Sequence, residues 1–161
     1  MDDIYAMPGH LIRRLQQISV SVFTERMRDL GQTLTSPQFA TLAALEAKPG
    51  IDQATLAGMI AHDRATIGGV VERLEGKGLV ERRQNPADRR AKVLSLTTNG
   101  ARLLAELRPV VTQLQADILP GLTQEERHEF VRLAAKVALA GNDFARAPLV
   151  MPDKKPQGST D

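Results

Sequence analysis

The sequence predicts a mainly α-helical fold with one small β-hairpin. Apolar residues recur at helical spacing along most of the 161 residues, and capping residues or prolines precede several of these stretches. Only residues 80–96 show two short β-compatible segments on either side of a turn. With 42% apolar residues, the chain can bury a modest core as one domain with extensions. No apolar run approaches the ~18 residues of a membrane span, so none is expected.

Two helices are expected in the first third of the chain. Pro8 suits a first helical turn, and apolar residues follow it at helical spacing as far as Leu30. Ser36 is the expected N-cap of a second helix, with Pro37 at its first position and its end at Lys48.

A pair of shorter helices is expected next. Asp52 is the expected N-cap of the first, which ends near His62, and Asp63 is the expected N-cap of the second. Gly78 follows the second helix, as glycine often does at a helix C-terminus. The apolar stripe of that helix consists of Ile67, Val70, Val71 and Leu74.

The remaining helices lie in the C-terminal third. Thr97 or Thr98 can cap a long helix in which Pro109 should produce a kink or a break. Thr123 and Glu126 form the capping box of a last helix. The proline-rich polar composition after residue 144 predicts disorder. The expected division is therefore an N-terminal helix at 1–34, a central unit of short helices and a hairpin at 35–98, C-terminal helices at 99–144 and a disordered tail at 145–161.

Composition and spacing exclude several kinds of chemistry. The chain contains no cysteine, which removes disulfides, thiolate metal sites and thiol-based redox sensing. His10, His62 and His128 do not have metal-ligand spacing, and no nucleophile or acid–base set is recognisable. We therefore expect no enzyme activity, no metal and no cofactor. The first residues lack a signal-peptide pattern, which together with the missing cysteines favours a cytoplasmic protein.

The net charge of +2 is concentrated in one central block. Residues 62–92 carry eight basic and five acidic side chains, whereas residues 1–34 carry four of each and residues 93–161 carry eight of each. A localised positive patch is the electrostatic footprint expected for a polyanionic partner.

The two short helices predict a helix-turn-helix, in which the second helix enters the DNA major groove with its N-terminal part leading. Arg64 can read a guanine edge, and Thr66 can meet a phosphate or a thymine methyl group. Gly69 lies opposite the apolar stripe and would let the backbone approach DNA closely, with Arg73 further along. The alternative interpretation is an ordinary surface helix whose glycines and charges bind nothing.

The hairpin, with strands over residues 80–84 and 93–96, carries most of the charge excess. Its cationic tip suits DNA phosphates or the minor groove, where negative potential attracts arginine. Asp88 is expected to hold the Arg90 guanidinium in an extended pose, so that less entropy is lost on docking. The candidate DNA-binding residues of the hairpin are Arg82, Arg83, Asp88, Arg89, Arg90 and Lys92.

Three segments resemble the MarR family of winged helix-turn-helix transcriptional regulators. D-R-R-A-K-V-L-S-L-T at 88–97 is similar to the wing signature of that family, and DRATIGGVVERLEGKGLVER is similar to its recognition helix and exit. LTTNGARLL resembles the start of the following helix. The resemblance implies a homodimer built from interleaved first and last helices, and binding of a near-palindromic operator with half-sites about 10 bp apart.

Two apolar stripes are compatible with such a dimer, although ordinary packing within one chain would explain them equally well. One stripe is Val110, Val111, Leu114 and Ile118, and the other is Phe130, Leu133, Val137 and Leu139.

Family members commonly release DNA when an aromatic compound binds between the dimer helices and the winged domain. Polar residues at helical spacing on the first helix fit an aromatic acid: Arg14 can pair with a carboxylate, and His10 or Gln17 can bond a ring substituent. The candidate ligand-binding residues are His10, Arg14, Gln17, Ser21 and Phe39. The first segment also resembles the subgroup that controls breakdown of aromatic acids. A solvated helix face is the alternative.

Three functional hypotheses remain open at this point. The chain is a repressor released by an aromatic acid, a DNA-binding dimer without an effector, or a winged-helix interaction module that does not bind DNA. Salt-dependent binding to a specific palindrome would exclude the module that does not bind DNA. Ligand titration of the DNA complex would then distinguish the repressor from the dimer without an effector.

Overall fold

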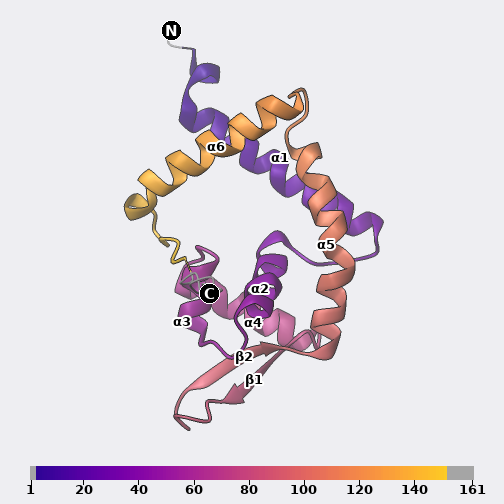
Figure 1. Ribbon diagram of the computed structural model, residues 1–161, viewed down its shortest axis with the longest axis vertical. Helices are drawn as coiled ribbons and strands as arrows, with labels where there is room; N and C mark the ends of the chain where they lie inside the picture. Colours follow the sequence, from indigo (N-terminus) through magenta and orange to yellow (C-terminus); the bar gives the residue numbers. More distant parts are fainter. Residues whose placement is uncertain (1–2, 152–161) are drawn as a thin grey trace, which may run out of the picture.

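The computed structural model describes residues 3–151 and is mainly helical with one antiparallel hairpin, which confirms the expected fold class. Figure 1 shows α2, α3, α4 and the hairpin in one lobe, with α5 leading from that lobe to α1 and α6. The elements are η1 (Ile4–Ala6), α1 (Pro8–Asp29), α2 (Ser36–Ala47), α3 (Gln53–Met59), α4 (Arg64–Gly76), β1 (Val80–Gln84), β2 (Lys92–Leu96), α5 (Thr98–Ile118), α6 (Gln124–Ala140) and η2 (Asn142–Phe144).

The lobe of α2, α3, α4 and the hairpin is built around residues with little or no exposed surface. The apolar stripe expected for α4 is buried, and it packs with side chains from α2, α3 and the hairpin. The side chains that are completely buried in this lobe include Leu42, Leu45, Leu56, Ile67, Val71 and Leu74. This shared core fixes the hairpin against α4.

Three sequence expectations differ in detail from the structure. The N-cap of α2 is Thr35 and not Ser36, because Gln38 then stands three residues later and completes a reciprocal capping box. Strand β2 begins at Lys92, one residue before the expected start. Pro109 was expected to produce a kink or a break. It lies inside a continuous α5, so the break does not occur. Thr97 caps α5 as one of the two expected residues.

The N-terminal helix packs against α5. Phe23 and Met27 of α1 are buried, as are Leu107 and Leu114 of α5. An ion pair between Arg26 Nη2 and Asp117 Oδ2 at 2.8 Å joins the same two helices. The α5 stripe that we predicted therefore packs within the chain, with Leu114 fully buried.

Helix α6 is different, because none of its residues is buried. Val131, Val137 and Leu139 are 59%, 65% and 78% exposed, and Leu133 is 46% exposed. Four large apolar side chains on one helix are costly to leave in water, at about 25 cal/mol per Å² of apolar surface. Of the predicted stripe, Phe130 is half-buried, whereas packing within residues 3–151 leaves Leu133, Val137 and Leu139 exposed.

Disorder was expected from residue 145 onward and stays a prediction; residues 145–151 have bends and no regular secondary structure. These residues follow η2 and contact α3, where the Val150 backbone N–H donates to the Gly58 carbonyl oxygen at 2.8 Å. No local pattern in the sequence indicates this contact, because it joins residues that are distant in the chain. Residues 152–161 of the expected tail lie outside the described residues. Across residues 3–151, no helix is both long and apolar enough to cross a membrane.

The turn between α3 and α4 holds Ala61 at φ +51°. This left-handed conformation costs an L-residue about 1–2 kcal/mol, and glycine escapes the cost. We therefore expect Ala61→Gly to raise the free energy of unfolding by about 1 kcal/mol in urea denaturation. Ala101→Gly, at an exposed position of helix α5, should lower it by a similar amount. A loss of stability in both variants would contradict the strain at Ala61.

Candidate DNA-binding surface

The N-terminus of α4 is fixed by Asp63. The carboxylate oxygen Oδ1 of Asp63 accepts the Thr66 backbone N–H at 2.9 Å and the Thr66 hydroxyl at 3.0 Å. Both bonds hold the pKa of Asp63 below its ordinary value, and the bond from the Thr66 backbone N–H has the larger effect. The Thr66 hydroxyl predicted to meet DNA is therefore engaged in capping the helix.

The outward face of α4 agrees with the helical geometry predicted from the sequence. Ile67 and Val71 are buried, whereas Arg64, Thr66 and Arg73 are exposed. No ion pair joins Arg64 or Arg73 to an acidic residue between residues 3 and 151. The leading end of α4 thus presents a cation and a capped helix terminus to solvent.

The two mid-helix glycines of α4 have different surroundings. A Cβ on Gly68 would lie 3.5 Å from Gln53 Nε2, in ordinary contact with α3. A Cβ on Gly69 would have nothing within 4 Å, so packing gives no reason for glycine there. Close approach of DNA remains the reason that we predict for Gly69.

We expect Gly69→Ala to separate stability from DNA binding. The methyl group should stabilise α4 by about 0.5–1 kcal/mol while weakening DNA binding, because it occupies space that the DNA would enter. Gly76→Ala is the matched control, since a Cβ there also has nothing within 4 Å and lies at the opposite end of α4. Urea denaturation and fluorescence anisotropy measure the two effects. Unchanged DNA affinity in Gly69→Ala would contradict the close approach.

Arg82 lies on the inner side of the hairpin, which corrects its expected role at the DNA backbone. Its Nε donates to Glu75 Oε2 at 2.9 Å and its Nη1 donates to Gln53 Oε1 at 3.1 Å. Arg82 therefore joins the hairpin to α4 and α3. Neither partner was identified from the sequence, since Glu75 lies within the recognition-helix segment but seven residues before Arg82, and Gln53 is 29 residues away from Arg82.

The hairpin tip is shaped by Asp88, but not as predicted. Asp88 Oδ1 accepts the backbone N–H of Arg90 at 2.9 Å, and no ion pair with the Arg90 guanidinium is present in the described part of the chain. A second local bond, from the Ala87 N–H to Asn85 Oδ1 at 2.9 Å, tightens the same turn. Asp88 thus fixes the backbone that carries Arg90 and leaves the guanidinium exposed.

The outer cations of the hairpin are exposed. Arg83 pairs with Glu81 at 2.7 Å, in a largely exposed contact. Arg89, Arg90 and Lys92 form no ion pair within residues 3–151. Figure 1 shows that the hairpin projects from the lobe of α2, α3 and α4.

The predicted ligand-binding residues do not converge within one chain. Phe39 packs edge-on against Phe23 at a ring-centroid distance of 6.2 Å. The polar side chains of α1 that were predicted to bind the ligand form a row along the helix. At 100° per residue, this row lies about 120–180° around the helix axis from Phe23. His10 instead contacts Tyr5 edge-on at 5.5 Å, and its buried Nε2 has no hydrogen-bond partner among residues 3–151. That row is His10, Arg14, Gln17 and Ser21.

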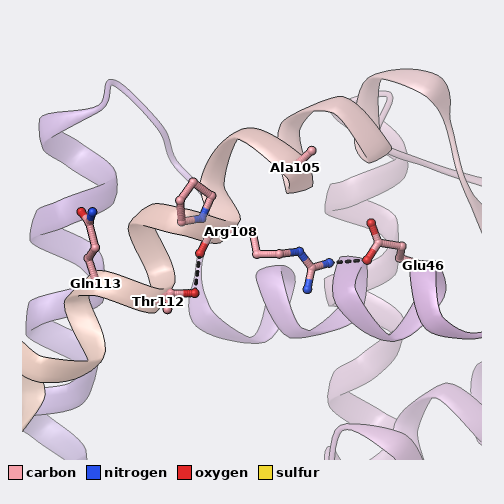
Figure 2. Close-up of a pocket in the computed structure, with 6 residues that line it drawn as sticks. Glu46, Ala105, Arg108, Thr112 and Gln113 are labelled. Atoms are coloured by element: carbon pink, nitrogen blue, oxygen red, sulfur yellow. Dashed lines mark hydrogen bonds and ion pairs between the residues drawn. The ribbon is translucent and has the colours of Figure 1, made fainter.

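A hollow of about 570 Å³ lies between α2 and α5, as Figure 2 shows. Arg108 of α5 reaches across to Glu46 of α2 and forms an ion pair with it. Thr112 lies on the α5 wall and donates to the Arg108 carbonyl oxygen at 2.9 Å. None of the predicted ligand-binding residues lines this hollow. Among the described residues, no group of histidine and acidic side chains is arranged so that it could hold a metal ion.

An exposed recognition-helix terminus and a projecting cationic hairpin, built on a core of three helices, define a winged helix-turn-helix protein of the DNA-binding type. The MarR family model matches residues 34–92. The repressor NicR of Pseudomonas putida is 36% identical over 135 residues, which cover 84% of each protein. This chain belongs to the MarR family of transcriptional regulators.

Solved structures agree with this assignment. BpsR of Bordetella bronchiseptica, whose DNA binding is regulated by 6-hydroxynicotinic acid, is 33% identical with a TM-score of 0.79, over 86% of this chain and 97% of BpsR. The repressor CouR, bound to a 23-mer DNA duplex, is 29% identical with a TM-score of 0.76, over 86% of this chain and 96% of CouR. Both proteins are regulators that bind DNA.

Proposed function

We propose that this protein is a homodimeric repressor whose sequence-specific DNA binding is released by a small aromatic acid. The exposed cations of the hairpin tip and the exposed, capped N-terminus of α4 carry the DNA-binding part of this proposal. Such a pair of features can place a helix in the major groove and cations beside the adjacent phosphates. The structural similarity to DNA-bound CouR supports the same interpretation.

The uncovered stripe of α6 supports the dimer. A second copy related by twofold symmetry would cover the exposed side chains of Val131, Val137 and Leu139. Two α4 helices in a symmetric dimer would then read a near-palindromic operator with half-sites about 10 bp apart.

The effector proposal depends on this dimer. Because the polar row on α1 points away from Phe39 of its own chain, a pocket that contains both requires α1 of one protomer and α2 of its partner. Arg14 is exposed and can pair with a carboxylate, as 6-hydroxynicotinic acid would require. The similarity to NicR and BpsR points to ligands of this class.

The decisive experiment begins with duplexes selected in vitro from genomic fragments. Fluorescence anisotropy should show salt-dependent binding of a dimer to a near-palindrome, and an aromatic acid should release the DNA. Arg14→Ala should abolish the release but keep DNA binding, whereas Arg28→Ala, on the same helix, should preserve both. If no aromatic acid stabilises the protein or releases the DNA, the effector is wrong. If no duplex binds, the winged domain has another partner.

One observation favours a second candidate, a DNA-binding dimer without an effector. The predicted ligand-binding residues line neither the hollow between α2 and α5 nor a second one beside α6. Their role would then be solvation or dimer contact, and the ligand titration above separates the two candidates.

A further inference from the structure

The chain returns to the helix-turn-helix after α6. The short helix η2 turns it, and the following residues lead down to α3, which Figure 1 shows as the yellow segment near the C-terminal end. The Val150 backbone N–H donates to the carbonyl oxygen of Gly58 at 2.8 Å. Because the last carbonyls of a helix lack partners within it, this bond satisfies an acceptor near the end of α3.

Asn142 closes this segment into a defined loop. Its Nδ2 donates to the Leu149 carbonyl oxygen at 3.2 Å, and its Oδ1 accepts the Leu149 backbone N–H at 2.8 Å. A single amide side chain thus satisfies both main-chain groups of one residue, which only asparagine or glutamine can do in this way. The loop is therefore held at its two ends, by Asn142 at α6 and by Val150 at α3.

Gly58 provides the space in which the loop rests. A Cβ at this position would lie 3.1 Å from Val150 Cγ2 and 3.2 Å from Val150 Cβ, closer than ordinary contact. Glycine inside a helix costs about 1 kcal/mol relative to alanine, so α3 is weakened where the loop meets it. The approach of Val150 gives a structural reason for a glycine inside this short helix.

This contact lies next to the turn that leads into the recognition helix. The Gly58 carbonyl also accepts the N–H of Ala61, the strained turn residue, at 3.3 Å. A hollow of about 710 Å³ is lined by Ala61, by the end of α6, and by Leu149 and Met151. Bonds from Thr66 chiefly lower the pKa of Asp63, and the positive charge of Arg146 in the loop lowers it further.

We infer that residues 142–150 form a strap that positions the helix-turn-helix relative to the dimerisation helix α6, and that Asn142 and Val150 are positioning residues for DNA binding. The inference rests on the proposed DNA-binding function. The strap fixes the place of α3 and the turn, so that α4 meets DNA at a defined distance from its symmetry mate.

The test uses the full chain and two variants. Asn142→Ala removes both bonds to Leu149, and Val150→Pro removes the N–H donor to Gly58. Hydrogen exchange of peptides that cover residues 145–151 should be faster by at least about tenfold in both. Affinity for the selected duplex should fall by about three- to tenfold with an unchanged salt slope, since no cation is lost.

Two controls make the result specific. Phe144→Ala changes a side chain of the same segment that is 92% exposed, and it should match the unmodified protein in exchange and affinity. Asn142→Asp keeps the acceptor for the Leu149 N–H but loses the donor, so it should fall between the unmodified protein and Asn142→Ala. Thermal melting confirms that each variant is folded.

Two results would overturn the strap. The first is exchange of residues 145–151 at the rate of an unstructured peptide in the unmodified protein. The second is an affinity within about twofold of the unmodified protein when exchange shows that the strap has been released. If the unmodified protein binds no selected duplex, the proposed function fails and the positioning role fails with it. If the unmodified protein binds a duplex while its strap is mobile, the strap inference fails and the proposed DNA-binding function stands.

Discussion

Gly100→Ala should destabilise the protein by about 3 kcal/mol or more, at the upper end of the range for overpacking. A Cβ on Gly100 would lie 2.0 Å from the Leu79 carbonyl oxygen and 2.9 Å from the Leu79 carbonyl carbon. Both are backbone atoms, so no flexible side chain can move aside. The same carbonyl accepts the Thr97 N–H at 3.1 Å, and this bond fixes the start of α5 against the hairpin.

Urea denaturation with a helical signal measures this loss. Since domains of this size are stable by only about 5–15 kcal/mol, a loss of this size should also lower the yield of folded protein. Gly76→Ala, where a Cβ meets nothing within 4 Å, makes the same chemical change without the clash and should be neutral or stabilising. Equal stability of the two variants would show that α5 can move away from Leu79 at little cost.

Arg90→Ala should weaken DNA binding more than any other single substitution in the hairpin. The guanidinium is exposed at the tip and forms no ion pair within residues 3–151. We expect a loss of about 1–3 kcal/mol, together with a salt slope that is flatter by about one unit for each protomer. Anisotropy titrations at several salt concentrations measure both quantities. An unchanged slope would mean that Arg90 does not contact a phosphate.

Asp88→Ala tests the geometry behind that prediction. Removing a negative charge near DNA phosphates should strengthen binding if charge alone matters. We expect weaker binding instead, because the Asp88 carboxylate accepts the Arg90 N–H at 2.9 Å and shapes the tip. The salt slope should then stay close to that of the unmodified protein, since the cations remain. Stronger DNA binding by Asp88→Ala would contradict the role of Asp88 in positioning the hairpin tip.

Local signals in the sequence determined the secondary structure and the main DNA-binding elements. Asp63, Thr97 and Thr123 cap the helices as predicted, because a cap and the N–H that it accepts lie three residues apart. The buried stripe of α4 follows from helical periodicity in the same way. The hairpin turn, the mid-helix glycines and the cluster of cations are likewise visible in short windows.

Only the tertiary structure decided which partner each long side chain has and which faces stay uncovered. Arg82 points to Glu75 and Gln53, no residue of α6 is buried by the described part of the chain, and Val150 reaches Gly58. Sequence patterns describe interactions within about four residues, as capping and helical pairing do. Contacts between distant residues depend on how complete helices pack, and a stripe of apolar residues does not say whether its own chain or a second copy will cover it.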